Sequence, residues 1–219
     1  MKLSELFEEC IRMQYIHIDN SADYALKKDG NTLYIFFESS NGAEDWRNNL
    51  DFPAKPYKRM GRTIWFAHRG FLNVWKSIEK YIAKDIADET VQKIVIVGYS
   101  HGAAIAVLCH EYVWFHRPDL RGNIEGYGFG CPRVFWGMQT ANLRRRWAGF
   151  LVIRNRGDIV THLPPAFLGY SHVGTVLTIG AFGKYTGFRA HYAENILNEI
   201  YIYENAVANP KKCFCKMGG

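Results

Sequence analysis

The chain has 219 residues, of which 48% are hydrophobic and 15% aromatic, and its formal net charge is +6. This composition excludes an intrinsically disordered protein, and the length is enough for one domain, residues 1–219, with a substantial core. No apolar run reaches the length of a membrane-spanning helix, so we expect no transmembrane segment. The stretch 1–13 mixes charged and apolar residues as an amphipathic helix does, unlike the uninterrupted apolar centre of a signal peptide. We therefore expect a cytoplasmic protein, or a secreted one if a leader has been removed.

The charge and the cysteines point to no nucleic acid, disulfide or metal. The arginine run at 144–146 falls in a predicted helix, where a solvated face explains it, and no basic stretch carries the interleaved aromatic residues of single-strand binders. The five cysteines are an odd number without framework spacing. Cys213 and Cys215 lie in a predicted flexible tail, residues 205–219, and no second ligand pair accompanies them, so we predict no metal site.

The N-terminal half shows helical and extended patterns in turn. Asp29-Gly30 favours a tight turn between two strands, and the second of these strands is apolar almost throughout, as a central strand is. The stretch 41–56 is polar and ends near two prolines. The predicted elements, in chain order, are helix 2–17, strands 22–28 and 32–38, strand 63–67 and helix 71–86.

The C-terminal half continues this alternation without a repeat or a linker. Its predicted elements are strand 94–97, a helix that runs to 116, strand 123–130, helix 135–147, strand 150–153, loop 154–165, strand 173–179 and helix 189–204. Strands that alternate with helices predict an α/β fold, with a mostly parallel central sheet and helices on both faces.

The most informative stretch is Gly98-Tyr99-Ser100-His101-Gly102, which follows four β-branched apolar residues and precedes small and aliphatic ones. A strand, a sharp turn and a helix in this order bring two backbones close together, and the glycines at both flanks meet that need. The turn lifts the Ser100 hydroxyl out of the sheet, beside a helix N-terminus. This is the pattern of the nucleophile elbow of α/β hydrolases, and it predicts Ser100 as a nucleophile.

A serine nucleophile needs a histidine that takes its proton and a carboxylate that holds the histidine. In α/β hydrolases the acid follows the nucleophile in the chain and the histidine comes last. Asp158 lies in the loop after the predicted strand 150–153, which predicts it as the acid. Asp119 follows a helix end and is better explained as a turn residue.

Three histidines follow Asp158. His191 begins the last predicted helix, from which it can reach over the elbow, and we favour it as the base. His172 begins a strand, and His162 lies only four residues from the acid in a proline-rich loop. These two remain alternatives on the residues alone.

The tetrahedral intermediate of acyl transfer also needs hydrogen-bond donors for its oxyanion. One is the backbone N–H of the residue after the nucleophile, here His101. The second should come from the loop after an early central strand, where Ser40 lies. This chemistry requires no metal and no organic cofactor.

Several further motifs occur in a fixed order over residues 30–200. They are Phe37-Glu38-Ser39-Ser40 with Asp45-Trp46 downstream, His68-Arg69-Gly70-Phe71, the elbow, Phe129-Gly130-Cys131-Pro132-Arg133-Val134, Asp158 to Pro165, Tyr170-Ser171-His172-Val173-Gly174, and His191-Tyr192. Together they resemble the class 3 lipases, the fungal-type, Rhizomucor-like triacylglycerol lipase family. Glu38-Ser39 replaces the family's Arg-Gly, and His101 replaces a common leucine.

The resemblance implies a role for each matching position. Ser100 would be the nucleophile, Asp158 the acid, His191 the base, and Ser40 with the His101 amide the oxyanion hole, whereas His172 would fall on a histidine that is not catalytic. The segment 41–52 would be a lid that contacts substrate. Its predicted apolar contacts are Trp46, Leu50 and Phe52.

We therefore expect a serine carboxylic-ester hydrolase that cleaves a lipid or another ester through an acyl-enzyme, with a lipid–water interface as one place of action. The same scaffold supports a feruloyl esterase or a phospholipase A1. A non-catalytic lipid-binding module is the alternative from another class of protein, and the order of the triad residues argues against it.

Overall fold

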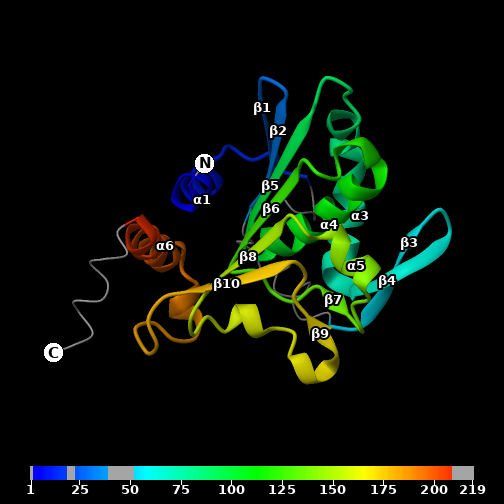
Figure 1. The fold of residues 1–219 in the computed structure, drawn as a ribbon. Coiled ribbons are helices and arrows are strands. Elements are labelled where there is room, and N and C mark those ends of the chain that lie inside the picture. Colours follow the sequence, from blue (N-terminus) through cyan, green and yellow to red (C-terminus); the bar gives the residue numbers. More distant parts are fainter. Residues whose placement is uncertain (1, 19–22, 39–51, 209–219) are drawn as a thin grey trace.

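The computed structural model describes residues 2–18, 23–38 and 52–208 (Figure 1). The predictions for Ser40, Trp46, Leu50, Cys213 and Cys215 lie outside these residues. Among the described helices, none combines the length and the apolar character needed to cross a membrane. The prediction of one domain over the whole chain stays a prediction.

A six-stranded sheet forms the centre of the described chain, in the order β1-β2-β5-β6-β8-β10. Its strands are β1 (Tyr24–Asp29), β2 (Thr32–Phe37), β5 (Lys93–Tyr99), β6 (Ile124–Phe129), β8 (Phe150–Asn155) and β10 (Thr175–Ile179). Strands β1 and β2 form an antiparallel hairpin, and every later strand pairs in parallel with its neighbour. The predicted α/β class with a mostly parallel sheet is confirmed.

Helices cover both faces of this sheet (Figure 1). The helices α3 (Arg69–Ile86) and α4 (His101–His116) pack on one face, and α1 (Leu3–Arg12) and α6 (Ala193–Ala208) on the other. Successive strand residues point to opposite faces, so Ile35 joins the first core cluster and Phe36 the second. Burial on both faces explains why the central strands are apolar almost throughout.

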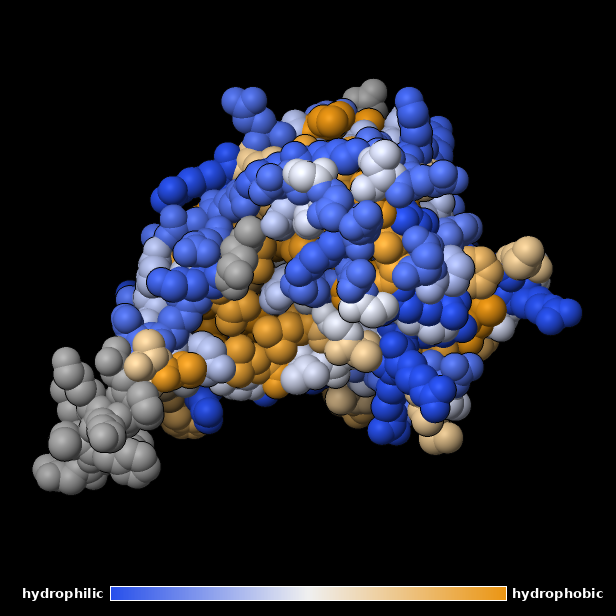
Figure 2. Space-filling model, turned by 45° about the horizontal axis from the view of Figure 1, so that its top comes forward, coloured by the Kyte–Doolittle hydropathy of each residue, from blue (hydrophilic) through white to orange (hydrophobic). Residues whose placement is uncertain are grey.

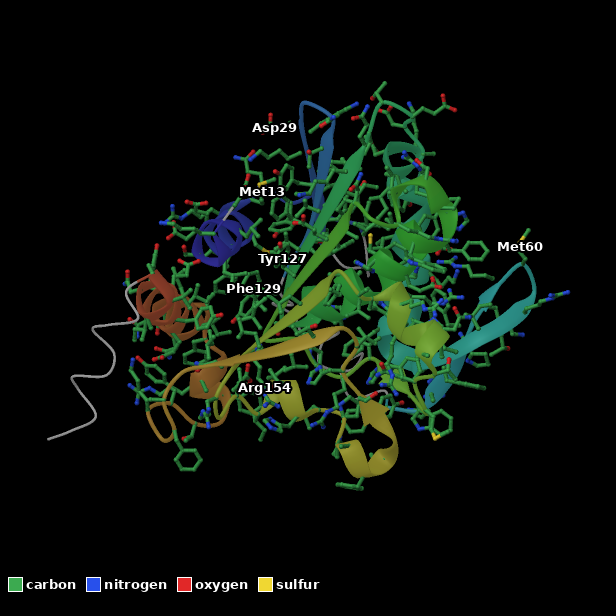
Figure 3. The ribbon with its side chains drawn as sticks, viewed as in Figure 1. Met13, Asp29, Met60, Tyr127, Phe129 and Arg154 are labelled. Atoms are coloured by element: carbon green, nitrogen blue, oxygen red, sulfur yellow. The ribbon has the colours of Figure 1, made fainter. Side chains whose placement is uncertain are left out.

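The second core layer is only partly covered. Tyr127 and Phe129 of β6 point towards α1 and α6 (Figure 3), and Phe129 is fully buried whereas Tyr127 is half-buried. Leu151 and Leu177 are half-buried in the same way. Figure 2 shows a mostly hydrophilic surface with one larger hydrophobic area in the lower half of the view.

A second, antiparallel sheet was not predicted. It has the order β3-β4-β7-β9 and is built from β3 (Ala54–Arg59), β4 (Arg62–His68), β7 (Phe135–Trp136) and β9 (Tyr170–Ser171). The predicted helix 135–147 is wrong in its first half, because Phe135 pairs with β4 and stacks on Trp65 with ring centroids 5.3 Å apart. Gly137, at φ +98°, then ends the strand, and only α5 (Ala141–Arg146) is helical.

Two helix boundaries also differ from the predictions. The first helix ends at Arg12, because Met13 is already extended with φ −61° and ψ 150°. The last helix begins at Ala193 and continues to Ala208, into the segment predicted as a tail. The short 3₁₀ helices of the connecting loops are η1 (Pro118–Leu120), η2 (Val160–His162), η3 (Ala166–Leu168) and η4 (Phe188–His191).

A buried charge cluster joins the second sheet to the main core. Glu111 of α4 is fully buried, and its carboxylate forms an ion pair with Arg59 at 3.7 Å and a hydrogen bond from Arg146. Burial raises the pKa of Glu111, although both arginines act to lower it. Arg146 is only 9% exposed, so the predicted solvated face of the arginine run is wrong for this residue.

We expect Glu111→Ala to lower the free energy of unfolding by about 3–5 kcal/mol, because it removes the buried carboxylate that Arg146 binds and leaves the buried Arg59, within the described chain, only its ion pair with Glu79 at 3.6 Å. Urea denaturation followed by circular dichroism measures this. The matched control is Glu125→Ala: Glu125 pairs with Lys93 at 2.5 Å, but both side chains are about two-fifths exposed (40% and 41%), so the loss should stay below about 1 kcal/mol. Equal losses in the two variants would contradict the role given to the cluster.

Candidate active site

Ser100 lies in a sharp turn between β5 and α4. Its backbone has φ 56° and ψ −121°, a strained conformation for a residue other than glycine, with a cost of about 1–3 kcal/mol. A Cβ atom on Gly98 would lie 2.3 Å from the Gly102 carbonyl oxygen, and one on Gly102 would lie 2.3 Å from that of Phe37. Both glycines are therefore required by close backbone contact, as predicted for a nucleophile elbow.

The structure brings Ser100, His191 and Asp158 together in one hydrogen-bonded row. His191 Nε2 lies 2.7 Å from Ser100 Oγ, and His191 Nδ1 lies 2.8 Å from Asp158 Oδ2. An ionised carboxylate only accepts hydrogen bonds, so Nδ1 carries the proton and Nε2 accepts from the serine hydroxyl. Ser100 follows β5, Asp158 lies in the loop after β8, and His191 belongs to η4. Each is more than 30 positions from the next in the sequence, and the fold brings all three into contact.

Asp158 is held rigidly in the loop after β8. Its side chain is fully buried, and its Oδ1 accepts a hydrogen bond of 2.9 Å from the Val160 amide. Its backbone oxygen accepts from Thr161 Oγ1 at 2.8 Å. The carboxylate therefore keeps its second oxygen directed at His191, which fixes the plane of the imidazole.

Gly130 forms the wall against which the imidazole rests. It follows β6 at φ +58°, and a Cβ atom there would lie 2.7 Å from His191 Cε1 and 2.9 Å from Nδ1. No side chain fits in this space. Its role could have been suspected from its place in the Phe-Gly-x-Pro-Arg motif, but its contact with the histidine is visible only in three dimensions.

The other candidate residues do other work. His162 Nδ1 donates to the backbone oxygen of Asp158 at 2.9 Å, and His172 Nε2 donates to that of Thr161 at 2.8 Å, so both support the acid loop. Asp119 lies in η1 and accepts hydrogen bonds from Arg117, the residue just before this short helix, as a turn residue does. Of the three candidate histidines, His191 is the one that the structure places on Ser100.

Of the two predicted oxyanion donors, His101 lies within the described residues and Ser40 does not. His101 is the first residue of α4, where backbone N–H groups have no acceptor within their own helix. Phe52, predicted as a lid residue, packs its ring edge-on to His68 with centroids 5.8 Å apart, and its carbonyl accepts a hydrogen bond from the Tyr170 hydroxyl. Within the described chain, no three histidine, cysteine or acidic residues are grouped in a way that could hold a metal ion.

The sequence over residues 34–168 matches the family described as Lipase (class 3), which is more than half of the chain. The chain belongs to the class 3 lipase family. The matched stretch contains the elbow and the acid loop, while His191 lies beyond it.

Several known lipases and lipase structures are similar to the chain. It is 29% identical to a lipase from Rhizomucor miehei over 167 residues, which are 71% of this chain and 44% of that protein. It is 30% identical over 115 residues to the secreted mono- and diacylglycerol lipase A of Penicillium cyclopium, covering 49% and 35% of the two chains. The chain thus spans less than half the length of these curated relatives.

The structure of a fungal lipase–inhibitor complex, described as a model for interfacial activation, superposes with a TM-score of 0.69. The superposition covers 85% of this chain and 83% of the lipase in that complex. The sequence identity is 21%, so the similarity concerns the fold. The predicted α/β-hydrolase architecture of a class 3 lipase is confirmed.

We expect Gly130→Ala to slow the labelling of Ser100 by a fluorophosphonate on the order of 100-fold, because the added methyl group displaces His191. Gly137→Ala is the matched control, since Gly137 also has a positive φ but has no atom within 4 Å of an added Cβ. Both variants should lose about 1–2 kcal/mol of stability to backbone strain. Equal labelling rates in the two variants would contradict the wall assigned to Gly130.

Acidification should destabilise the fold through His172. Burial lowers the pKa of this imidazole from 6.5 to about 4, so the folded protein binds fewer protons than the unfolded chain between these values. The contribution of His172 to the free energy of unfolding is therefore fully present above its pKa in the unfolded chain. It falls by about 2–3 kcal/mol as the pH drops towards the pKa of His172 in the folded protein. Urea denaturation at several pH values should give a shallower fall for His172→Gln than for the wild type; an equal fall would contradict this assignment.

Proposed function

We propose that this protein is a serine carboxylic-ester hydrolase that cleaves acyl esters of lipids through an acyl-enzyme. The observation that carries the proposal is the row Ser100–His191–Asp158, with hydrogen bonds of 2.7 Å and 2.8 Å, on a glycine-flanked elbow. Membership of the class 3 lipases supports the same chemistry. Each residue has the role that its geometry allows.

Acylation begins with Ser100. His191 Nε2 takes the hydroxyl proton as the serine oxygen attacks the ester carbonyl, and Asp158 stabilises the imidazolium that results. The tetrahedral intermediate carries its negative charge on the former carbonyl oxygen. Collapse expels the alcohol, which receives the proton from His191, and leaves the acyl group on Ser100.

Deacylation repeats the sequence with water. His191 takes a proton from the water molecule, the hydroxide oxygen attacks the acyl carbon, and Ser100 leaves with the proton returned from the imidazolium. We assign the His101 N–H as one oxyanion donor and Ser40 as the second. Both donors act on charge that exists only in the transition state and the intermediate, which is where they lower the barrier.

The residues near Asp158 and His191 in the sequence favour an apolar acyl chain. Ile159, Phe188 and Tyr192 are 42%, 48% and 55% exposed, and they flank Asp158 and His191 along the chain. Exposed apolar side chains that lie close in sequence to these two residues suit a lipid ester better than a polar one. The names of the relatives, a lipase and a mono- and diacylglycerol lipase, agree with this class. We propose that Trp46, Leu50 and Phe52 add further apolar contacts as a lid.

We expect Ser100→Ala to lower kcat on p-nitrophenyl butyrate by at least ~10⁴-fold, because no other group supplies the nucleophile. His191→Ala should lose nearly as much, and the double variant should lose little more, since the two residues act as one unit. Ser171→Ala is the control and should retain wild-type turnover. Substantial turnover by Ser100→Ala would overturn the proposal.

A substrate panel then separates the alternatives. Emulsified triacylglycerols, phosphatidylcholine vesicles and a feruloyl ester should be compared with the soluble ester at equal enzyme concentration. Preference for the emulsion supports a lipid ester hydrolase, while preference for the feruloyl ester or the phospholipid would assign the substrate differently. Lipid binding without turnover or fluorophosphonate labelling would favour a non-catalytic module.

A further inference from the structure

The backbone of the η4 turn that carries His191 is held from two strand ends. Tyr99 Oη donates a hydrogen bond of 2.6 Å to the carbonyl oxygen of His191 itself. Asn155 Nδ2 donates one of 2.8 Å to the preceding carbonyl, that of Ala190. Two successive carbonyls of the turn are therefore fixed by side chains from the ends of β5 and β8, the strands that lead to Ser100 and Asp158.

These bonds supply what the helix itself does not. The hydrogen bonds that start α6 run from the amides of Asn195 and Ile196 to the carbonyl of Tyr192, both at 3.0 Å. The carbonyl of His191 lies one residue before this start, where the helix does not hold it. Tyr99 thus binds the backbone at the residue whose side chain must meet Ser100.

Tyr99 also fixes the plane of the imidazole. Its ring stacks on that of His191, with centroids 5.4 Å apart and an interplanar angle of 28°. The Cε1–Nδ1 edge of the imidazole lies against Gly130, where not even a Cβ atom fits. One side chain, adjacent to the nucleophile in sequence, therefore restrains both the backbone and the ring of the histidine.

The N-terminal helix supports Tyr99 from the other side. Phe7 of α1 is fully buried and meets the Tyr99 ring edge-on at 5.3 Å, and it stacks on Phe129 at 4.5 Å. The Phe129 carbonyl in turn accepts the amide hydrogen bond of Ser100 at 2.9 Å. The contacts Phe7–Tyr99–His191 connect α1, which lies outside the stretch matched to the family, with the candidate base.

We propose that Tyr99 is the positioning residue of His191, which it holds by the hydrogen bond to the carbonyl and by ring stacking, with Phe7 of α1 as its support. The inference rests on the proposed ester hydrolysis, because it assigns Tyr99 a part in that reaction. Tyr99 neither takes nor gives a proton. Burial, with the nearby charge of Asp158, raises the pKa of its hydroxyl, so this group remains a hydrogen-bond donor across the working range of the protein.

Tyr99→Phe tests the hydrogen bond alone, because the ring remains. We expect kcat on p-nitrophenyl butyrate to fall by roughly 5- to 20-fold while KM changes less than about twofold, since a displaced base slows proton transfer and leaves substrate binding unaltered. The rate of fluorophosphonate labelling should fall by the same factor. The downfield proton resonance of His191 Nδ1–H should broaden or shift, which a general loss of stability would not produce in a folded sample.

Tyr127→Phe is the matched control. Tyr127 lies on the neighbouring strand β6, on the same side as Phe129 (Figure 3), and its hydroxyl donates to Glu125 at 2.9 Å, away from the histidine. This variant should keep kcat within about twofold of the wild type and leave the resonance unchanged. Equal effects of the two substitutions, or an unchanged kcat and resonance in Tyr99→Phe, would overturn the assignment.

A further variant and the wild type separate the remaining outcomes. Phe7→Leu leaves Tyr99 in place but removes its support, and we expect kcat to fall roughly two- to fivefold at constant KM. This variant decides the matter if Tyr99→Phe does not fold, and an unaltered kcat would then count against the proposal. If the wild type hydrolyses no ester, the proposed function fails, whereas the His191 resonance still tests the contact with Tyr99.

Discussion

The close contact of three backbone segments at the elbow is the constraint on which the site depends. The end of β2, the end of β5 and the first turn of α4 meet at Gly98 and Gly102, where any side chain would overlap a carbonyl group. This contact forces Ser100 into a strained conformation and directs its hydroxyl away from the sheet. The cost of the strain is offset by the buried strands and by α4, so the Ser100 hydroxyl is held in one place by the fold itself.

That rigidity makes the histidine the variable part of the site. Ser100 and Asp158 stand at the ends of parallel strands, whose relative positions are set by the ladder of β5, β6 and β8. His191 instead belongs to a short turn between a loop and α6. The position of His191 therefore depends on hydrogen bonds from the side chains of Tyr99 and Asn155 and on the close approach of the imidazole to Gly130.

The sequence was informative where structure is decided locally. The sharp turn at Ser100, the place of Asp158 after β8 and the meeting of both with His191 were all predictable, because strand, turn and helix signals lie within a few residues of each. The antiparallel sheet was not, because Phe135 pairs with Ala67 and stacks on Trp65, both distant in sequence, and these contacts override the helical spacing of 135–147. The burial of Arg146 was missed for the same reason, since its partner Glu111 lies on another helix. The contacts of Tyr99 were likewise not predicted, although it is adjacent to Ser100 in the sequence.

The stretch that matches the class 3 lipases contains the residues held by the sheet, and the turn held by side chains lies outside it. Residues 34–168, which match the class 3 lipases, contain the parts fixed by the sheet. The candidate base and both helices of the second core layer, α1 and α6, lie outside that stretch. The end of a strand can be predicted from its own residues. A turn that is held by side-chain hydrogen bonds requires only a donor near its backbone carbonyls, and that donor can come from different residues. The turn at Ser100 is thus part of the stretch shared with the class 3 lipases, whereas the proposed alignment of Ser100 with His191 depends on contacts between Phe7, Tyr99 and the η4 turn.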